Sequence, residues 1–168
     1  DSPKWIGAPP PSLATLRGKP VIVYLWAHWC PDCKAQGPVL EALLEKYKST
    51  GLTLVAPTKF YGYVAKREPA GPDVELTYLT GIRDSVYPWM KTVSVPISEQ
   101  IFAQYGVSTT PTLVLIDRAG NVSKYNPGQL TTAQLEPMIQ KIVGPPATAS
   151  QHEHEQPRAA GYSGRRFK

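Results

Sequence analysis

Cysteine is scarce in this chain, which has only two, Cys30 and Cys33, among its 168 residues. A four-ligand zinc site needs further cysteine or histidine, and no second pair lies at ligand spacing in the part of the chain expected to fold. We therefore expect neither a metal site nor another bound cofactor. The chain also has no apolar stretch of the roughly 18 residues that a membrane-spanning helix requires.

Strong charge of one sign is also missing. The formal net charge is +5, of which residues 145–168 supply +2, from four Arg and Lys minus two Glu, and the rest of the chain +3, from 14 minus 11. A surplus this small and this dispersed does not favour nucleic acid as a partner. The basic residues at the end of the chain, from Arg165 to Lys168, are best explained as a solvated terminus.

The two cysteines stand in the segment Trp29-Cys30-Pro31-Asp32-Cys33-Lys34. At this spacing two thiols can close a small ring if a helix starts between them, with Cys30 at its exposed N-terminal end. The positive end of the helix and its free N–H groups favour a thiolate there, which predicts Cys30 as the nucleophile. A purely structural disulfide is a weaker explanation, because so short a loop restricts the unfolded chain little.

The residues around the dithiol predict a strand-to-helix junction. Residues 21–27 form an unbroken apolar run, typical of a strand that is buried on both faces of a sheet. After the dithiol, apolar residues recur at helical spacing between positions 39 and 47. Pro38 lies inside this pattern and is expected to kink the helix.

A second segment, Thr109-Thr110-Pro111-Thr112, precedes the apolar run of residues 113–116 and a turn near Gly120. Together with the segment around the dithiol, it resembles the two signatures of thioredoxin-fold proteins. The resemblance covers about residues 5–143 and is closest to the TlpA/ResA-like thiol-disulfide oxidoreductases. It implies an α/β thioredoxin-like fold, a central mixed sheet flanked by helices, in which Pro111 is cis and faces the dithiol.

The resemblance also implies a site and a compartment. It makes Cys30 and Cys33 catalytic, and it assigns Trp29, Pro31, Asp32, Thr110 and Pro111 to the docking of protein substrates. TlpA/ResA-like proteins work in the periplasm or an equivalent envelope space of bacteria. Since the chain opens with Asp1 and shows no signal core, we expect a mature form from which a signal or membrane anchor was removed.

The spacing of 78 positions between Cys33 and Pro111 (111 − 33) predicts an insertion beyond a minimal thioredoxin. Residues 53–56 are expected to form the second parallel strand, and residues 59–95 hold the inserted material. Within it we expect a strand at residues 74–79, a loop at 69–72 and a short helical turn at 85–90. Ser98 is expected to cap a helix that Gly106 ends, and residues 117–121 to form a hairpin turn.

Toward the C-terminus, Thr131 and Gln134 form a capping box before a last amphipathic helix. Pro137 predicts that its regular part begins only after Glu136. Residues 1–144 are expected to form one thioredoxin-like domain. Residues 145–168 lack apolar periodicity and predict a flexible basic tail, in which His152 and His154 are better explained as solubilising residues than as metal ligands.

The chain departs from the family near Cys33. Thioredoxins have a buried carboxylate close to the position of Tyr24, and TlpA/ResA-like proteins commonly have Glu where this chain has Gln36. Both usual acceptors for the Cys33 proton are therefore absent, which leaves water or a carboxylate from the insertion. His28 is expected at the surface, and Asp32 opposes thiolate formation, which favours a reductant.

These features predict a monomeric enzyme that exchanges disulfides with protein partners, as a reductant fed by an upstream electron donor. A thiol peroxidase related to peroxiredoxins is the alternative enzyme. It is disfavoured because such enzymes place Thr three positions before the reactive cysteine, where this chain has Ala27. A third alternative is a binding module that uses the fold as a scaffold, and the presence of both cysteines argues against it.

Overall fold

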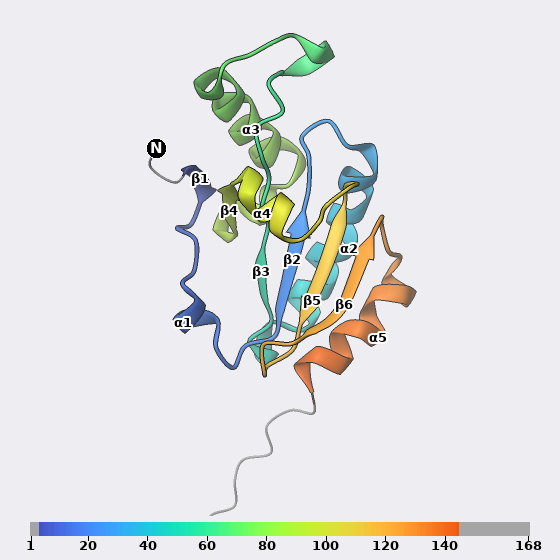
Figure 1. Ribbon diagram of the computed structural model, residues 1–168. Coiled ribbons are helices and arrows are strands. Elements are labelled where there is room, and N and C mark those ends of the chain that lie inside the picture. Colours follow the sequence, from blue (N-terminus) through green and yellow to red (C-terminus); the bar gives the residue numbers. More distant parts are fainter. Residues whose placement is uncertain (1–3, 145–168) are drawn as a thin grey trace, which may run out of the picture.

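The computed structural model describes residues 4–144 of the chain (Figure 1). The expected tail, residues 145–168, lies outside the described residues. The strands are β1 (Lys4–Gly7), β2 (Val21–Leu25), β3 (Thr53–Val55), β4 (Ser94–Ile97), β5 (Thr112–Ile116) and β6 (Val122–Pro127). The α-helices are α1 (Leu13–Leu16), α2 (Pro31–Lys46), α3 (Pro72–Val86), α4 (Glu99–Gln104) and α5 (Thr132–Val143). Short 3-10 helices are η1 (Lys48–Thr50), η2 (Ala65–Arg67) and η3 (Pro88–Thr92).

The strands form one mixed sheet in the order β1-β4-β3-β2-β5-β6. Strand β2 lies in the middle, parallel to β3 and antiparallel to β5, and β3 is parallel to β4. The edges are antiparallel additions, β1 on β4 and β6 on β5. This confirms the predicted α/β thioredoxin-like fold, the second parallel strand and the β5–β6 hairpin.

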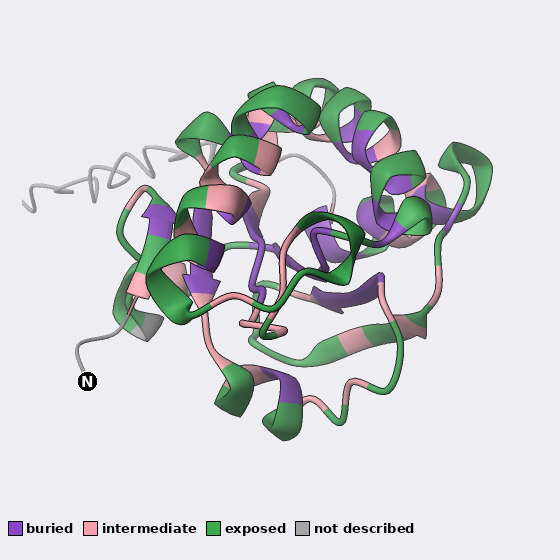
Figure 2. Cartoon of the chain, turned by 90° about the horizontal axis from the view of Figure 1, so that it is seen from above, coloured by how far each residue is buried: buried purple, intermediate pink, exposed green. Residues whose placement is uncertain are grey.

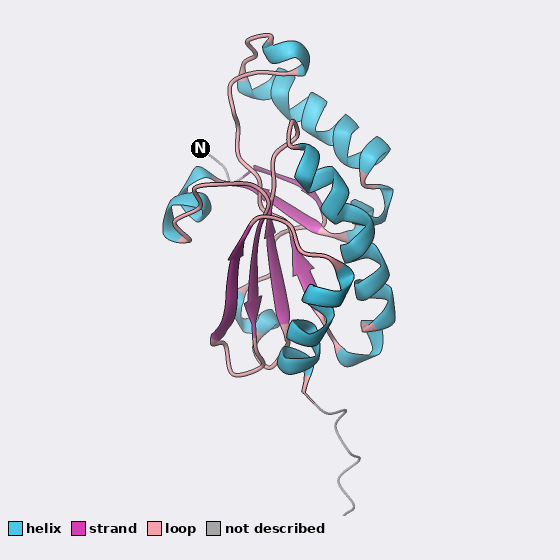
Figure 3. Cartoon of the chain, turned by 90° about the vertical axis from the view of Figure 1, so that its right-hand side faces the viewer, coloured by secondary structure: helices cyan, strands magenta, loops and turns pink. Residues whose placement is uncertain are grey.

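Helices cover the two faces of the sheet unequally (Figures 1 and 3). All five residues of β2 are buried, and because side chains alternate along a strand, they supply both faces. Ile22 and Tyr24 belong to the larger core, which includes Leu40 of α2 and Ile139 of α5. Residues on the other side of β2 pack with α4 in a smaller core. Figure 2 shows this buried interior enclosed by exposed helix surfaces.

The inserted segment is helical where a strand was predicted. Residues 74–79 lie inside α3, which begins at Pro72, a residue whose fixed φ suits the first turn of a helix. The buried positions Glu75, Leu79 and Arg83 recur every four residues, as one face of a helix requires. The alternation of apolar and polar residues in this segment suggested a strand with Val74 on its buried face. In the helix Val74 is exposed and Glu75 is buried instead.

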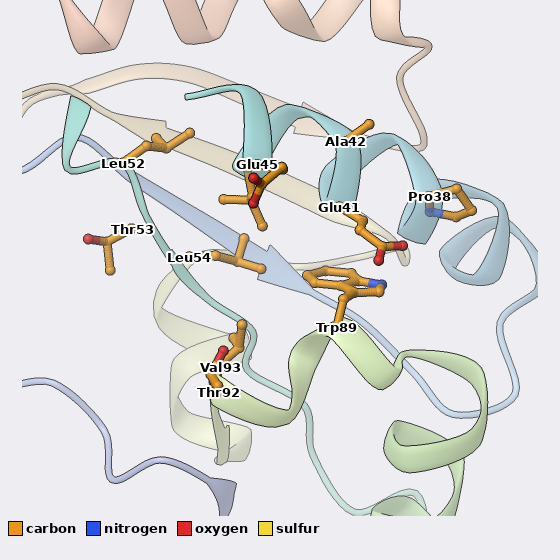
Figure 4. A pocket seen from close by; sticks show the side chains of 11 residues that line it. Pro38, Glu41, Ala42, Glu45, Leu52, Thr53, Leu54, Trp89, Thr92 and Val93 are labelled. Atoms are coloured by element: carbon orange, nitrogen blue, oxygen red, sulfur yellow. The ribbon is translucent and has the colours of Figure 1, made fainter. Parts of the chain in front are cut away.

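The end of the insertion packs on α2. The predicted turn at residues 85–90 is divided between the end of α3 and η3. The Tyr87 ring, which lies between them, contacts α2 so closely at Gly37 that a Cβ there would be 3.2 Å from two of its carbons. Figure 4 shows the neighbouring cleft between α2 and η3, with the Trp89 ring near Glu41 and Leu54.

Two of the α-helices contain an internal proline. Helix α2 continues through Pro38 as a single element of 16 residues. Helix α5 begins at Thr132, so the expectation that it starts after Glu136 is wrong. The predicted capping box of Thr131 and Gln134 is present and supplies hydrogen-bond acceptors for backbone N–H groups at the start of the helix. Packing of its apolar face against the core stabilises the helix through Pro137.

The Arg118 guanidinium joins three segments at the hairpin end of β5. It donates to the backbone oxygens of Gly18 at 3.0 Å, Thr50 at 2.6 Å and Val143 at 3.0 Å. These carbonyls belong to the loop before β2, to η1 and to the last residue of α5. One side chain therefore holds together three connections that are distant in sequence. No helix among residues 4–144 is long and apolar enough to cross a membrane.

Candidate active site

The dithiol lies where the chain leaves β2 and enters α2. Cys30 is the N-cap of α2 and Pro31 its first residue. The Cys30 Sγ accepts a hydrogen bond from the backbone N–H of Cys33 at 3.1 Å. The sulfur thus takes the place that a hydroxyl or carboxylate oxygen has in an ordinary helix cap, and it meets a free N–H group of the first turn.

Cys30 was predicted to lie exposed at the end of the helix, but it is buried, and only 2% of its surface is accessible. Its thiol donates to the backbone oxygen of Thr110 at 3.2 Å, and the peptide bond between Thr110 and Pro111 is cis. The segment before β5 therefore meets the helix end at the nucleophile. Pro31 and Asp32 are exposed beside it.

Trp29 and Trp26, which follow the end of β2, differ in exposure. Trp26 is fully buried, and its Nε1 donates to the backbone oxygen of Ala56 at 3.0 Å. Trp29 is 46% exposed, which is unusual for so large an apolar side chain. An exposed aromatic ring therefore stands next to Cys30.

Cys33 lies one turn further into α2 and is fully buried. Burial raises the pKa of its thiol, and hydrogen bonding with Cys30 raises it further. The Tyr24 hydroxyl donates to the backbone oxygen of Cys33 at 2.8 Å. Burial first, and then the proximity of Cys33, raises the pKa of Tyr24, so its phenol stays protonated and can donate a hydrogen bond but cannot serve as a base.

Gln36 is buried on the same helix, and its Oε1 accepts from the backbone N–H of Leu130 at 2.7 Å. Its Nε2 has no hydrogen-bond partner among the described residues. The side chain is therefore tied to the chain before α5 and carries no charge. At the position where TlpA/ResA-like proteins commonly have a carboxylate, this chain offers only an amide.

His28 is buried, so the expectation of a surface histidine is wrong. Its Nε2 lies 3.5 Å from the Glu75 Oε1 of the insertion, and both side chains are 1% exposed. Burial lowers the pKa of His28, against the opposing effect of Glu75. The insertion does bring a carboxylate to this end of the molecule, but Glu75 contacts His28 and two backbone N–H groups rather than Cys33.

Glu75 was not singled out from the sequence. The available signal was its place at helical spacing with Leu79 and Arg83, which puts a carboxylate on the buried face of α3. Among residues 4–144 no group of three or more His, Cys, Asp or Glu side chains is arranged to hold a metal ion.

The sheet order, the dithiol at a helix N-terminus and the facing cis-proline define a thioredoxin-fold redox protein. Residues 12–142 match the family model of the thioredoxin-like domain, and the chain belongs to that family. Thiol-disulfide oxidoreductase ResA of Bacillus thuringiensis (strain Al Hakam) is 28% identical over 130 residues, which cover 77% of this chain and 67% of that protein.

Solved structures support the fold. A thiol-disulfide isomerase from Corynebacterium glutamicum is 18% identical with a TM-score of 0.67, covering 84% of this chain and 92% of that one. A thiol:disulfide interchange protein of the thioredoxin family from Chlorobium tepidum TLS is 22% identical with a TM-score of 0.60, and the match covers 78% of this chain and 84% of that one. The family match and the ResA relative establish the chain as a thiol-disulfide oxidoreductase.

Proposed function

We propose that the protein reduces disulfides of other proteins in the bacterial envelope. The observation that carries this proposal is the environment of Cys33, which is buried and has no hydrogen bond to a carboxylate or imidazole within residues 4–144. A dithiol becomes a strong oxidant when its thiolate form is stabilised. Burial destabilises the thiolate form of Cys33, and this lowers the tendency of the Cys30–Cys33 disulfide to accept electrons.

In the proposed reaction the Cys30 thiolate attacks one sulfur of a target disulfide. A Cys30–target disulfide forms, and the second target sulfur leaves as a thiolate that takes up a proton. Cys33 then loses its proton and attacks the Cys30 Sγ, which releases the first target sulfur as a thiol. The target gains two electrons and two protons, and the protein is left with a Cys30–Cys33 disulfide that an upstream donor must reduce.

The same proposal assigns docking to residues around Cys30. Trp29, Pro31 and Asp32 are exposed beside the nucleophile. The backbone oxygen of Thr110, which precedes the cis-proline Pro111, accepts from the Cys30 thiol, and this segment suits a target chain that adds strand-like hydrogen bonds there. The chain's relation to ResA is what supports a location in the envelope.

The equilibrium reduction potential against glutathione tests the direction of transfer. We expect a value below about −250 mV, at or beneath the cytosolic glutathione poise and well under that of strong oxidants. A potential near −120 mV, typical of a protein that donates disulfides, would contradict the proposed role as a reductant. Such a result would leave the thiol-disulfide exchange itself in place.

A further inference from the structure

Glu75 is a buried carboxylate that the dithiol reaction does not use. Its Oε1 accepts from the backbone N–H of Tyr61 at 2.6 Å, and its Oε2 from that of Gly62 at 2.9 Å. Its third partner is His28, at 3.5 Å. A buried carboxylate is costly unless its partners stay in place, so these contacts fix the loop before α3 against the segment that leads to Cys30.

Aromatic rings complete the contact between the insertion and His28. Tyr61, Tyr63 and Tyr78 each meet the imidazole edge-on, with ring centroids 5.6, 5.4 and 5.3 Å away. Tyr61 and Tyr63 come from the loop and Tyr78 from α3. The insertion is therefore joined to the residue two positions before Cys30 by a polar contact and by three aromatic ones.

This attachment places a second aromatic ring beside the exposed Trp29. The Tyr61 ring meets the Trp29 ring edge-on, with centroids 5.6 Å apart and an angle of 86° between their planes. The Tyr61 hydroxyl donates to the backbone oxygen of Trp26 at 3.4 Å. The ring centroids of Tyr63 and Tyr61 are 6.4 Å apart, and both tyrosines are partly exposed. We call Trp29, Tyr61 and Tyr63 the aromatic shelf.

The shelf has the properties of a recognition surface. It adjoins the nucleophile, and none of its side chains is charged at neutral pH. Partly exposed aromatic side chains bind other apolar or aromatic groups well, because they offer large area at little cost in side-chain entropy. Its geometry depends on Glu75, since the backbone N–H groups of Tyr61 and Gly62 are held by that carboxylate.

We propose that the aromatic shelf selects protein disulfides whose reacting cysteine is next to an aromatic or large apolar side chain, and that Glu75 acts as the positioning residue that holds the shelf in place. The proposal rests on the proposed disulfide reductase function and adds the substrate class. The insertion between β3 and β4 is then the part of the chain that determines which substrates are accepted.

The test compares two peptides, each with one intramolecular disulfide, that differ only in Phe or Ser beside the cysteine that is attacked. Reduced full-length protein is mixed with each, and kcat and KM are obtained with a recycling reductant. We expect the Phe peptide to be favoured in kcat/KM by about tenfold, the size of one good aromatic contact. Because each protein serves as its own reference, a general loss of dithiol reactivity cancels in this ratio.

Tyr61→Ala removes a shelf ring at a partly exposed position and is expected to bring the ratio close to one. Glu75→Gln is expected to reduce it by raising KM for the Phe peptide rather than by lowering kcat. Tyr125→Ala is the matched control, because Tyr125 is an exposed tyrosine on β6 outside the shelf, and it should keep the ratio of the unmodified protein.

An unmodified ratio near one, or a Tyr61→Ala protein that keeps the preference for Phe, would overturn the shelf while leaving the reductase function intact. A protein that reduces neither peptide nor a small aromatic disulfide would overturn the proposed function, and the shelf with it. A Glu75→Gln change confined to kcat would overturn the positioning role of Glu75.

Discussion

Cys30 and Cys33 differ in what surrounds each sulfur rather than in exposure, since both are almost fully buried. Cys30 caps α2 and accepts a backbone N–H, which suits a negatively charged sulfur. Burial raises the pKa of Cys33, so this residue stays a thiol until a step requires its proton to leave. The chemical asymmetry predicted from the spacing therefore rests on different physical grounds.

Serine substitutions should separate the two roles. Cys33→Ser removes the resolving thiol, so it should accumulate mixed disulfides with target proteins. Cys30→Ser should trap almost none, because the raised pKa of the Cys33 thiol leaves little thiolate to attack a target. Non-reducing electrophoresis of purified variants incubated with an oxidised target gives the measurement, and equal trapping by both variants would contradict the assignment.

Gln36→Glu should speed the release of the mixed disulfide. A carboxylate one turn after Cys33 can accept its proton, and its Oε1 can still accept from the backbone N–H of Leu130. We expect the release rate at pH 7 to rise about tenfold or more, measured by stopped-flow with a trapped target. Gln104→Glu, at an exposed position in α4, is the control and should have no effect.

At the level of elements, the contact between Tyr87 and α2 makes Gly37 a sensitive position. Gly37→Ala would place a Cβ 3.2 Å from the ring of a fully buried tyrosine, which has little room to move. The resulting overpacking should exceed the gain in helix propensity and lower the free energy of unfolding by about 1–2 kcal/mol.

Gly81→Ala is the matched control within α3, because nothing lies within 4 Å of the Cβ it would add. It should raise the free energy of unfolding by about 0.5–1 kcal/mol, since alanine replaces glycine in a helix interior. Urea unfolding curves of both variants give the comparison. Equal effects of the two substitutions would show that the Tyr87 contact can relax.

The elements that the sequence predicted well are those whose local and tertiary signals agree. The apolar run of β2, the cap of α4 at Ser98 and the capping box of α5 all lie as expected. Helix α3 was missed because its buried face carries Glu75 and Arg83, and charged side chains hide a helical apolar pattern. Helix α5 keeps Pro137 because its apolar face packs on the core, a contact that a local rule does not include.

For the whole molecule, the buried His28 should make stability depend on pH. Burial lowers its pKa, so below the unfolded value of about 6.5 the unfolded chain binds a proton that the native protein resists. Its contribution is therefore fully present above pH 6.5 and is lost as the pH falls toward the lowered native pKa.

His28→Gln isolates this effect. Between pH 7.5 and about 5.5, the unmodified protein should lose more stability than the variant, because the variant lacks the imidazole whose pKa burial lowers in the native state, whereas His152 and His154 are present in both proteins. Urea unfolding at several pH values measures the difference. Parallel pH profiles would mean that His28 is protonated equally in both states.

Much of the candidate site was predictable because its two segments carry family signatures, with Cys30 and Cys33 in one and Pro111 in the other. The burial of Cys30 was not, since it results from the approach of Thr110, which is 80 positions away. The contact between His28 and Glu75 was also missed, because it depends on how the insertion folds back on the loop after β2. Pairings across such distances depend on tertiary packing, which no short pattern records.

The three carbonyls that share the Arg118 guanidinium have a consequence for hydrogen exchange. Because one guanidinium holds all three segments, they should open together, and the amide protons around Gly18, Thr50 and Val143 should exchange as one cooperative unit although the segments are far apart in sequence. Arg118→Ala should then lower protection in all three segments at once while the amides of β2 keep theirs. The end of the sheet far from the sulfur chemistry would thus behave as a single foldon, held together by one arginine.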